Sequence, residues 1–348
     1  MIIIGEKLNG AIPLVAQAIA KRDGQCIREL AKRQADAGAD FIDICASVDQ
    51  GEAETLKWMI EQVESVTDVP VSIGSPSTEV LVEVYRFCNK PGLFNSTSME
   101  KRKQIEQIFH IMKEQSGWRA IAMLCDDAGI PKSVEERLSV FDAIMEKAKA
   151  HGIDPARIYI DPMAEAAALM DPEQEDGPGI SVYTKVVGAI RRKYPTIHII
   201  SAISNISYQL PARKYMNGSL AALALAYGVD SGILNPLSRE LLGVIKASEA
   251  LLALPTKAFE QLINAVKENR GKGNGLLKLE GFEDEEGQKA LEQAATVLAM
   301  GAGADVKLPT TDRNLNGMVY AARALLGRDE DGHCLEYIKA YKHGLFGV

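Results

Sequence analysis

Residues 198–217 read His-Ile-Ile-Ser-Ala-Ile-Ser-Asn-Ile-Ser-Tyr-Gln-Leu-Pro-Ala-Arg-Lys-Tyr-Met-Asn. The first half is apolar and β-branched, which is typical of a buried strand in a parallel sheet. It ends in the small polar residues Ser204 and Asn205, and a loop with Arg213 and Asn217 follows. Such a strand places amide and hydroxyl groups on a rigid support at its carboxyl end. An ordinary strand followed by a helix-capping loop would show the same residue types. Whether this segment binds a ligand therefore depends on what the rest of the chain predicts.

The rest of the chain repeats this pattern of a short apolar run followed by a longer segment of helical period. The candidate strands are 2–4, 41–45, 69–73, 92–94, 119–124, 158–160, 198–203 and 228–234. The alternation predicts strand–helix units around a parallel sheet, the α/β class. Eight units within about 255 residues is the size of a TIM (β/α)8 barrel. An open doubly wound sheet would leave several of these strands unused.

Composition excludes several classes of protein. The 348 residues carry 39 Lys and Arg against 47 Asp and Glu, a net charge of −8, without a basic cluster. A nucleic-acid surface and attraction to anionic lipid are therefore not expected. The five cysteines are scattered, as is typical of reduced thiols in a cytoplasm. No leader and no apolar run of 18 residues is found, so we expect a soluble cytoplasmic protein.

Polar or acidic side chains lie at the end of nearly every predicted strand. In chain order they include Glu6, Asn9, Asp43, Asn95, Asp126, Asp161, Asn205 and Asn235. In a TIM barrel the carboxyl ends of the strands meet at the rim that carries active sites. A single Asn or Asp there is often only a helix cap or an Asx turn. Together, however, these amides and carboxylates suit a flat polar heterocycle better than a phosphate.

Several common chemistries lack their motifs. There is no phosphate-binding glycine-rich loop, no His-Glu-x-x-His and no Gly-x-Ser-x-Gly elbow. The five histidines are dispersed, so we predict that the protein holds no metal of its own. Lys7 is the nearest to a strand-end lysine for a Schiff base, and we expect it to face solvent or a carboxylate. Binding or acid–base chemistry by Asp and Asn remains.

Six segments of this sequence, in this order, resemble one known family. They are Gly5-Glu6-Lys7-Leu8-Asn9-Gly10, Gly38-Ala39-Asp40-Phe41-Ile42-Asp43, Asn95-Ser96-Thr97-Ser98, residues 126–131, Asp161-Pro162, and Ser204-Asn205-Ile206-Ser207 with Leu210-Pro211-Ala212-Arg213. They are similar to the pterin-binding methyltransferases that exchange a methyl group between methyltetrahydrofolate and a corrinoid protein. These enzymes are relatives of dihydropteroate synthase. The resemblance spans roughly residues 1–252, and this many motifs in register make it specific.

The resemblance implies roles for the residues at the barrel rim. Asn95 and Asp161 would hydrogen-bond the pterin ring, and a carboxylate can accept two N–H bonds from its 2-amino-pyrimidinone edge. Asn205 matches the family's mobile Asn, which contacts the methyl-bearing nitrogen, and is the predicted catalytic residue. The remaining substrate-binding candidates at the mouth are Glu6, Asn9, Asp43, Asp126, Ser204 and Arg213.

The chemistry implied by the resemblance fits these residue types. Methyl transfer from nitrogen to cobalt needs a proton or a hydrogen bond at that nitrogen, and the cobalt is the nucleophile. The protein's task is therefore orientation and stabilisation of charge. The implied substrate is tetrahydrofolate or its methyl form, and the cobalamin is carried by a separate corrinoid protein, since no Asp-x-His-x-x-Gly motif occurs here. A homodimer and a demethylation or one-carbon pathway are also implied, while the direction of transfer stays open.

Two alternatives remain for the function. A condensing enzyme like dihydropteroate synthase is disfavoured, because Ser204-Asn205-Ile206-Ser207 follows the seventh strand where that reaction needs a lysine. A non-catalytic pterin-binding protein is the other. It is favoured only by Gly74, where the family usually has Asp. Cys45 stands where relatives often carry Asn or Gly, and we expect it to be a small buried side chain.

The barrel, residues 1–254, is followed by a C-terminal extension, residues 255–348. Residues 223–252 align with residues 297–326 at a constant offset of 74, and Gly243 matches Gly317 in that register. We interpret the extension as an α/β segment that partly duplicates the last helix–strand–helix unit. Convergence on a common Ala/Leu helical pattern is the alternative. The last residues, 334–347, resemble the family's own terminus, so we predict that residues 255–303 are extra material on the outside of the barrel.

Overall fold

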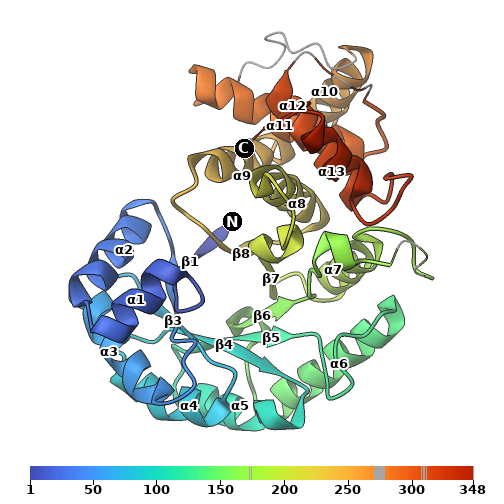
Figure 1. Cartoon of the computed structure of the whole chain (residues 1–348). Helices are drawn as coiled ribbons and strands as arrows, with labels where there is room; N and C mark the ends of the chain where they lie inside the picture. Colours follow the sequence, from blue (N-terminus) through green and yellow to red (C-terminus); the bar gives the residue numbers. More distant parts are fainter. Residues whose placement is uncertain are drawn as a thin grey trace.

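Eight parallel strands form a closed barrel in sequence order, as the computed structural model shows (Figure 1). The structure describes residues 1–171, 173, 175–269, 279–306, 308, 310 and 312–347. The strands are β1 (Ile2–Asn9), β2 (Phe41–Cys45), β3 (Val71–Gly74), β4 (Leu93–Ser98), β5 (Arg119–Met123), β6 (Ile158–Asp161), β7 (His198–Ala202) and β8 (Ser231–Leu234). Pairing of β1 with both β2 and β8 closes the sheet. The predicted TIM barrel is confirmed.

Helices surround the barrel and alternate with the strands. They are α1 (Pro13–Lys21), α2 (Gly24–Asp36), α3 (Glu52–Glu64), α4 (Thr78–Val84), α5 (Ile105–Glu114), α6 (Val134–Ala150), α7 (Ser181–Lys193), α8 (Arg213–Tyr227) and α9 (Arg239–Leu252). Serines cap the first turns of several of them, and Ser133 of α6 forms a capping box with Glu136. Each of these helices except α2 follows a strand, directly or after a longer loop as before α6 and α7, so its N-terminus faces the rim formed by the carboxyl ends of the strands.

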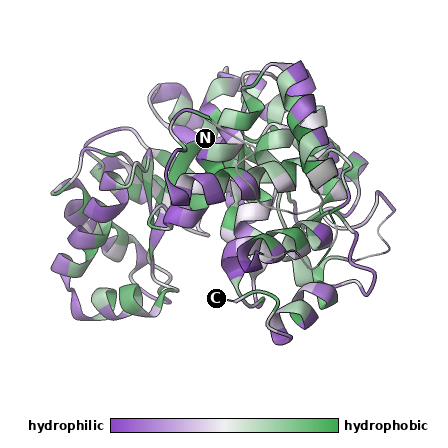
Figure 2. Ribbon diagram, turned by 90° about the horizontal axis from the view of Figure 1, so that it is seen from above, coloured by the Kyte–Doolittle hydropathy of each residue, from purple (hydrophilic) through white to green (hydrophobic). Residues whose placement is uncertain are grey.

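The barrel is held by two apolar layers. Inside it, Ile4, Phe41, Leu93, Ile121, Tyr159 and Ile200 form a buried cluster near the amino ends of the strands. A larger cluster lies between the strands and the helices. The colouring of Figure 2 alternates between hydrophobic and hydrophilic along the helices, as expected of helices with one buried face. The packed interior leaves the carboxyl ends of the strands as the place for a site.

The extension consists of helices in its described part. They are α10 (Thr256–Asn269), α11 (Glu285–Gly301), α12 (Arg313–Leu325) and α13 (Leu335–Lys342), beyond α8 and α9 (Figure 1). We expected an α/β segment, yet the described residues of 255–348 contain no strand; residues 307, 309 and 311, in the part equivalent to the end of β8 and the loop after it, lie outside the described residues. The barrel is closed, so a copied strand has no open sheet edge with which to pair. Among the described residues, no helix has the length and apolar character needed to cross a membrane.

Candidate functional site

A cavity of about 570 Å³ opens at the carboxyl ends of the strands. Seven of the predicted site residues line it, namely Glu6, Asn9, Asp43, Asn95, Ser204, Asn205 and Arg213. They come from β1, β2, β4, the segment after β7 and the first residue of α8, so residues far apart in sequence meet at one rim. Asp126 and Asp161 are not among the lining residues.

On one side of the cavity a buried carboxylate organises its neighbours. Asp43 is 6% exposed, and its Oδ1 accepts hydrogen bonds from Ser72 Oγ at 2.5 Å and Asn95 Nδ2 at 2.9 Å. Burial raises the pKa of Asp43 above its ordinary value, and the two hydrogen bonds oppose that shift. The orientation of the Asn95 amide is fixed by this bond, so its carbonyl oxygen remains available to accept.

The opposite side is built on the short 3₁₀ helix η5 (Ile203–Ser207) that follows β7. Ser204 Oγ donates to Glu6 Oε2 at 2.8 Å, and burial raises the pKa of Glu6. Arg213, the first residue of α8, donates to the Ser204 carbonyl at 2.6 Å and to Ser207 Oγ at 2.8 Å. Arg213 therefore holds η5 in place while it also lines the cavity.

Asn205 differs from its neighbours because its side chain is exposed in the cavity wall. Within the described chain, its amide makes no hydrogen bond with another residue. The backbone beneath it is fixed by Arg213, whereas the amide keeps both its donor and its acceptor free. This is the arrangement required of a group that acts on a ligand atom.

Three predicted residues have local roles in the structure. Asp161 is 7% exposed at the end of β6, and its Oδ1 accepts the Met163 amide hydrogen at 2.8 Å. Burial raises the pKa of Asp161 to about 6. The Oδ1 of Asp126 accepts the Ala128 amide hydrogen at 2.8 Å, and Asn9 Oδ1 accepts that of Ala11 at 2.9 Å. These are the Asx turns described above as the ordinary alternative.

The cavity wall contains further functional groups, of which the sequence placed only Asn235 at the rim and gave none a role in the site. Lys7, Lys214, Asn217, Asn235 and Ser238 also line it. The Oδ1 of Asn217 is buried and has no partner in the described part of the chain, so it is free to accept a hydrogen from a ligand. Its spacing from Arg213, one helical turn, would have placed both side chains on the same face of α8.

Comparison with known proteins gives the family. The family model of the pterin-binding enzymes matches residues 15–235. A methylcorrinoid:tetrahydrofolate methyltransferase of Eubacterium limosum is 43% identical over 268 residues, which cover 75% of this chain and 97% of the relative. The chain belongs to the pterin-binding enzyme family. The quarter of the chain outside that alignment corresponds in size to the C-terminal extension.

Solved structures share the fold of this pterin-binding enzyme. A dihydropteroate synthase from Clostridium difficile, crystallised in the presence of pteroic acid, has a TM-score of 0.54 and 18% identity, covering 72% of this chain and 96% of its own. One from Xanthomonas albilineans has a TM-score of 0.52 and 16% identity, covering 73% and 92%. At this level of identity the similarity establishes the barrel and not the reaction.

Gly74 ends β3, at the position where the family resemblance predicts an Asp. A Cβ atom at Gly74 would lie 3.0 Å from the Ile44 carbonyl oxygen and 3.2 Å from the Cβ of Cys45. It would also lie 3.6 Å from Oδ2 of Asp43. Cys45 thus crowds the place where the usual Asp would begin. The two departures noted in the sequence, Gly74 and Cys45, are neighbours in space.

We expect the Gly74→Asp substitution to be tolerated better together with Cys45→Gly than alone, because Cys45→Gly removes one of the two close contacts and leaves only that with the Ile44 carbonyl oxygen. The double variant adds a carboxylate beside Asp43, and a pterin edge with two N–H donors relieves the repulsion between the two. Its affinity for tetrahydrofolate should rise about tenfold, the equivalent of about 1.4 kcal/mol. Isothermal titration calorimetry measures this, with each single substitution as control. Equal affinity of the double variant and the parent would contradict this role of position 74.

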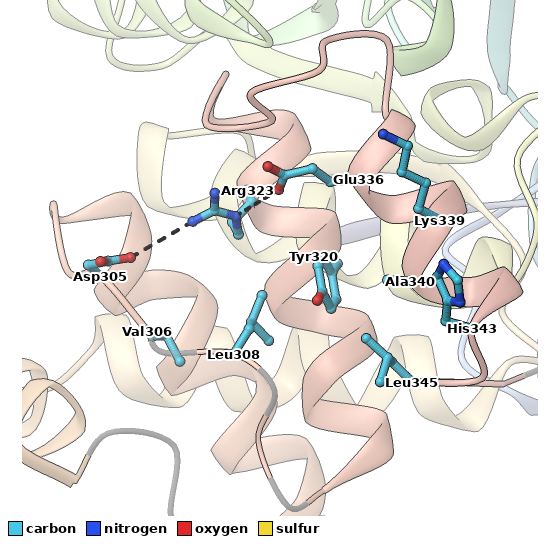
Figure 3. Close-up of a pocket in the computed structure, with 10 residues that line it drawn as sticks. All are labelled: Asp305, Val306, Leu308, Tyr320, Arg323, Glu336, Lys339, Ala340, His343 and Leu345. Carbon is cyan, nitrogen blue, oxygen red and sulfur yellow. Dashed lines mark hydrogen bonds and ion pairs between the residues drawn. The ribbon is translucent and has the colours of Figure 1, made fainter.

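A second hollow, of about 510 Å³, lies in the extension between α12 and α13 (Figure 3). Arg323 stands at its edge and is paired with Glu336 at 3.1 Å and with Asp305 at 4.0 Å. No predicted site residue lines this hollow. In the described part of the chain, no group of three or more His, Cys, Asp or Glu side chains is arranged to hold a metal ion.

Proposed function

We propose that this chain is a methyltransferase that exchanges a methyl group between tetrahydrofolate and the cobalt of a corrinoid held by a separate protein. The observation that carries the proposal is the 43% identity, across 97% of its length, to a relative with that pair of substrates in its name. The rim cavity supports it, since amides and carboxylates from four parts of the barrel converge there.

In this proposal the pterin ring lies in the rim cavity and the chain orients it. Asn95, held by Asp43, would bind the ring edge from the cavity wall. Asp161 is assigned to the same edge by the family resemblance alone, since its buried carboxylate does not line the cavity in this structure. Asn205 would act at N5. In the direction towards folate, N5 forms a bond to the methyl carbon, the cobalt retains the electron pair of the broken bond, and N5 releases its proton. An amide both donates and accepts, so Asn205 can accept the N5 hydrogen or donate to methylated N5 in the reverse direction.

The proposal includes the partners and setting expected from the sequence. Folate is a substrate, and the cobalamin is brought by its own corrinoid protein. The methyl group belongs to a demethylation or one-carbon pathway, such as O-demethylation. The cytoplasmic location and the homodimer stay predictions. A condensation like that of dihydropteroate synthase remains disfavoured by the sequence of η5, and the shared fold does not favour it.

The test is turnover with free cobalamin. Mixing the chain with methyltetrahydrofolate and cob(I)alamin should replace the cob(I)alamin absorption spectrum by that of methylcobalamin, catalytically and in proportion to enzyme. Tetrahydrofolate binding without turnover, either with free cobalamin or with a corrinoid protein, would favour the non-catalytic alternative. Absence of folate binding would reject the pterin site itself.

The loop that carries Asn205 is anchored by the extension. Tyr337 of α13 is fully buried and directs its hydroxyl at the carbonyl oxygens of Ala212 (2.9 Å) and Pro211 (3.1 Å). Ala212 has a φ of 46° and no side-chain cap at the start of α8, so this conformation depends on such support. A contact thus runs from α13 through Ala212 and the adjacent Arg213 to η5.

We expect Tyr337→Phe to lower kcat for methyl transfer about fivefold, with the KM for folate unchanged. The reason is that one hydrogen bond worth about 1 kcal/mol is lost from the support of η5, while the pterin contacts remain. Steady-state kinetics give both constants. Tyr341→Phe is a matched control, since Tyr341 lies in the same helix and its ring also packs near Phe346. If both variants lost kcat equally, the anchoring role would be wrong.

A further inference from the structure

The helices α11 and α12 reproduce α8 and α9 in length and spacing. Adding 74 to the bounds of α8 gives 287–301, against Glu285–Gly301 observed for α11. Adding 74 to those of α9 gives 313–326, against Arg313–Leu325 for α12. The connections, residues 228–238 and 302–312, are of equal length; the first contains β8, and the described residues of the second (302–306, 308, 310 and 312) contain no strand. A common Ala/Leu pattern does not impose equal connections, so duplication explains the repeat better than convergence.

The original pair and its copy pack against each other in a symmetric way. α11 packs on α9, and α12 packs on α8, while α8 and α11 also touch. In the repeat, α11 is the copy of α8 and α12 is the copy of α9. The contact between α9 and α11 is therefore equivalent to the contact between α12 and α8. This is the symmetry of a two-fold interface between identical surfaces. In such an interface, residue i of the first copy contacts residue j of the second, and residue j of the first contacts residue i of the second.

The symmetry extends to single residues. Gly243 of α9 and Gly317 of α12 are equivalent in the repeat. A Cβ atom on Gly243 would be 3.2 Å from the Cβ of Ala290 in α11, and one on Gly317 would be 2.6 Å from the ring of Tyr215 in α8. Tyr215 corresponds to position 289, next to Ala290. The two glycines therefore lie against adjacent positions of equivalent helices.

A hollow of about 870 Å³ opens between the two pairs and is lined by residues of both, and apolar side chains around it are buried. Equivalent apolar residues are buried in both halves, namely Leu223 and Val297, Leu241 and Leu315, Val244 and Met318, Ala247 and Ala321, and Leu251 and Leu325. Two hydrogen bonds add specificity, from Tyr215 to Asn314 Oδ1 at 2.7 Å and from Ser219 to the Met318 carbonyl at 3.2 Å. The buried apolar side chains and these two hydrogen bonds hold the two pairs together around the hollow.

The last helix follows the copy and reaches the original. Arg323 of α12 is paired with Glu336, next to Tyr337, so α13 is fastened to α12 (Figure 3). From there Tyr337 reaches Ala212, and Phe346 packs on the ring of Tyr215, in α8. Without the duplication α13 would follow α9. In a pair of such chains, each α13 would then hold the η5 loop of the other copy.

We infer that the α8–α9 face is a self-complementary interaction surface, and that in this chain the repeat α11–α12 supplies within one molecule the partner that a second copy would otherwise provide. The tethered repeat is present at a high effective concentration, so it excludes a second copy from this face. Any homodimer of this chain uses another surface. The division after residue 254 then separates the barrel from the segment that contains the repeat α11–α12. This inference does not depend on the proposed reaction.

The first test uses the full chain and a disulfide across the contact. Cysteines placed by Gly243→Cys and Ala290→Cys would have Cβ atoms about as close as a disulfide requires, roughly 3.5–4.5 Å after a small adjustment. After oxidation with oxidised glutathione, the cross-linked chain should run as a monomer on a non-reducing gel. The two variants that carry only one of these substitutions are the controls, because they show which disulfides the five native cysteines form. A covalent dimer specific to the double variant would show that the repeat comes from another copy and would overturn the inference.

The second test removes one repeat. Deleting residues 253–326 joins Leu252 to Gly327, as Leu326 is joined in the parent, and leaves a chain near the length of the relative. At about 100 µM this chain should sediment as a dimer, and adding Gly243→Arg should make it monomeric. A folded, folate-binding monomer without Gly243→Arg would overturn the inference. If the shortened chain does not fold, the disulfide result in the full chain decides.

Discussion

Asn205→Ala should slow methyl transfer by more than about tenfold, a loss of at least about 1.4 kcal/mol of transition-state stabilisation. Its amide is exposed in the cavity wall and makes no hydrogen bond within the described chain, while Arg213 fixes the backbone of η5 beneath it. Removing the side chain therefore removes an interaction with the substrate nitrogen without disturbing a structural contact. The expected signature is a lower kcat with folate affinity changed by less than about threefold.

Stopped-flow spectroscopy of cobalamin methylation measures the transfer step, and calorimetry measures folate binding. Tyr208→Ala is a suitable control, because Tyr208 is 57% exposed and follows η5 directly. Arg213→Lys tests the neighbouring support and should lower kcat less than Asn205→Ala does. If Asn205→Ala transferred methyl groups at the parent rate, the catalytic assignment would be wrong even if folate still bound.

The barrel could be predicted from the sequence because strands and helices leave different patterns. The strands are short apolar runs, and the helices are longer amphipathic segments. The sequence did not predict that β1 continues to Asn9. The pairing of β1 with β2 shifts register between Gly5 and Leu8. An irregularity of this kind depends on the partner strand, and it places Glu6 within the strand and at the cavity.

The extension was predicted as an α/β segment because its sequence repeats a helix–strand–helix unit. The helices of the copy form with nearly the same bounds, since an α-helix satisfies its backbone hydrogen bonds internally. A strand must pair with another strand, as β8 pairs with β1 and β7. Of the four residues of β8, only Leu234 has an identical counterpart in the repeat, Leu308, and the apolar Ile233 is replaced by Lys307. The helical part of the repeat could be predicted from sequence, while the fate of the strand depended on the closed sheet.

The rim residues were predictable as a set, but their partners were not. Asp43 was predicted as a mouth residue, whereas Ser72, which donates to it from β3, was not. Ser72 is a polar residue in an apolar strand, and only the barrel shows which neighbour it faces. Conversely, Asp126 and Asn9 were predicted from a sequence pattern that also describes Asx turns. In the structure the side-chain Oδ1 of each accepts a hydrogen bond from the backbone N–H two residues further on.

Asp161→Asn should weaken tetrahydrofolate binding by about 10- to 100-fold. A carboxylate that accepts two N–H bonds from the pterin edge contributes roughly 1.5–3 kcal/mol, and the amide can reproduce only one of them. The Asn oxygen can still accept the Met163 amide hydrogen, so the local turn is retained. Because burial raises the pKa of Asp161 to about 6, folate binding by the parent should also weaken as the pH falls through that value.

The same substitution should stabilise the free protein at alkaline pH. The carboxyl of Asp161 is ionised above about pH 4 in the unfolded chain but only above about pH 6 in the folded one. Between those values the folded state binds more protons, so stability falls as the pH rises, by up to about 3 kcal/mol. Asn carries no such cost. Asp161→Asn should therefore be more stable than the parent at pH 8, with the difference vanishing near pH 4.

Urea unfolding of the ligand-free proteins at pH 8 and at pH 4 measures this difference. Asp126→Asn is the matched control, since that carboxylate also accepts a backbone hydrogen two residues on but is only partly buried. Replacing a residue that supports folding lowers the stability of the protein. Replacing a residue whose role is to bind a ligand raises the stability of the ligand-free protein. A gain in stability together with a loss of folate affinity would thus identify Asp161 as a binding residue. A loss of both would instead assign Asp161 to the support of the loop after β6.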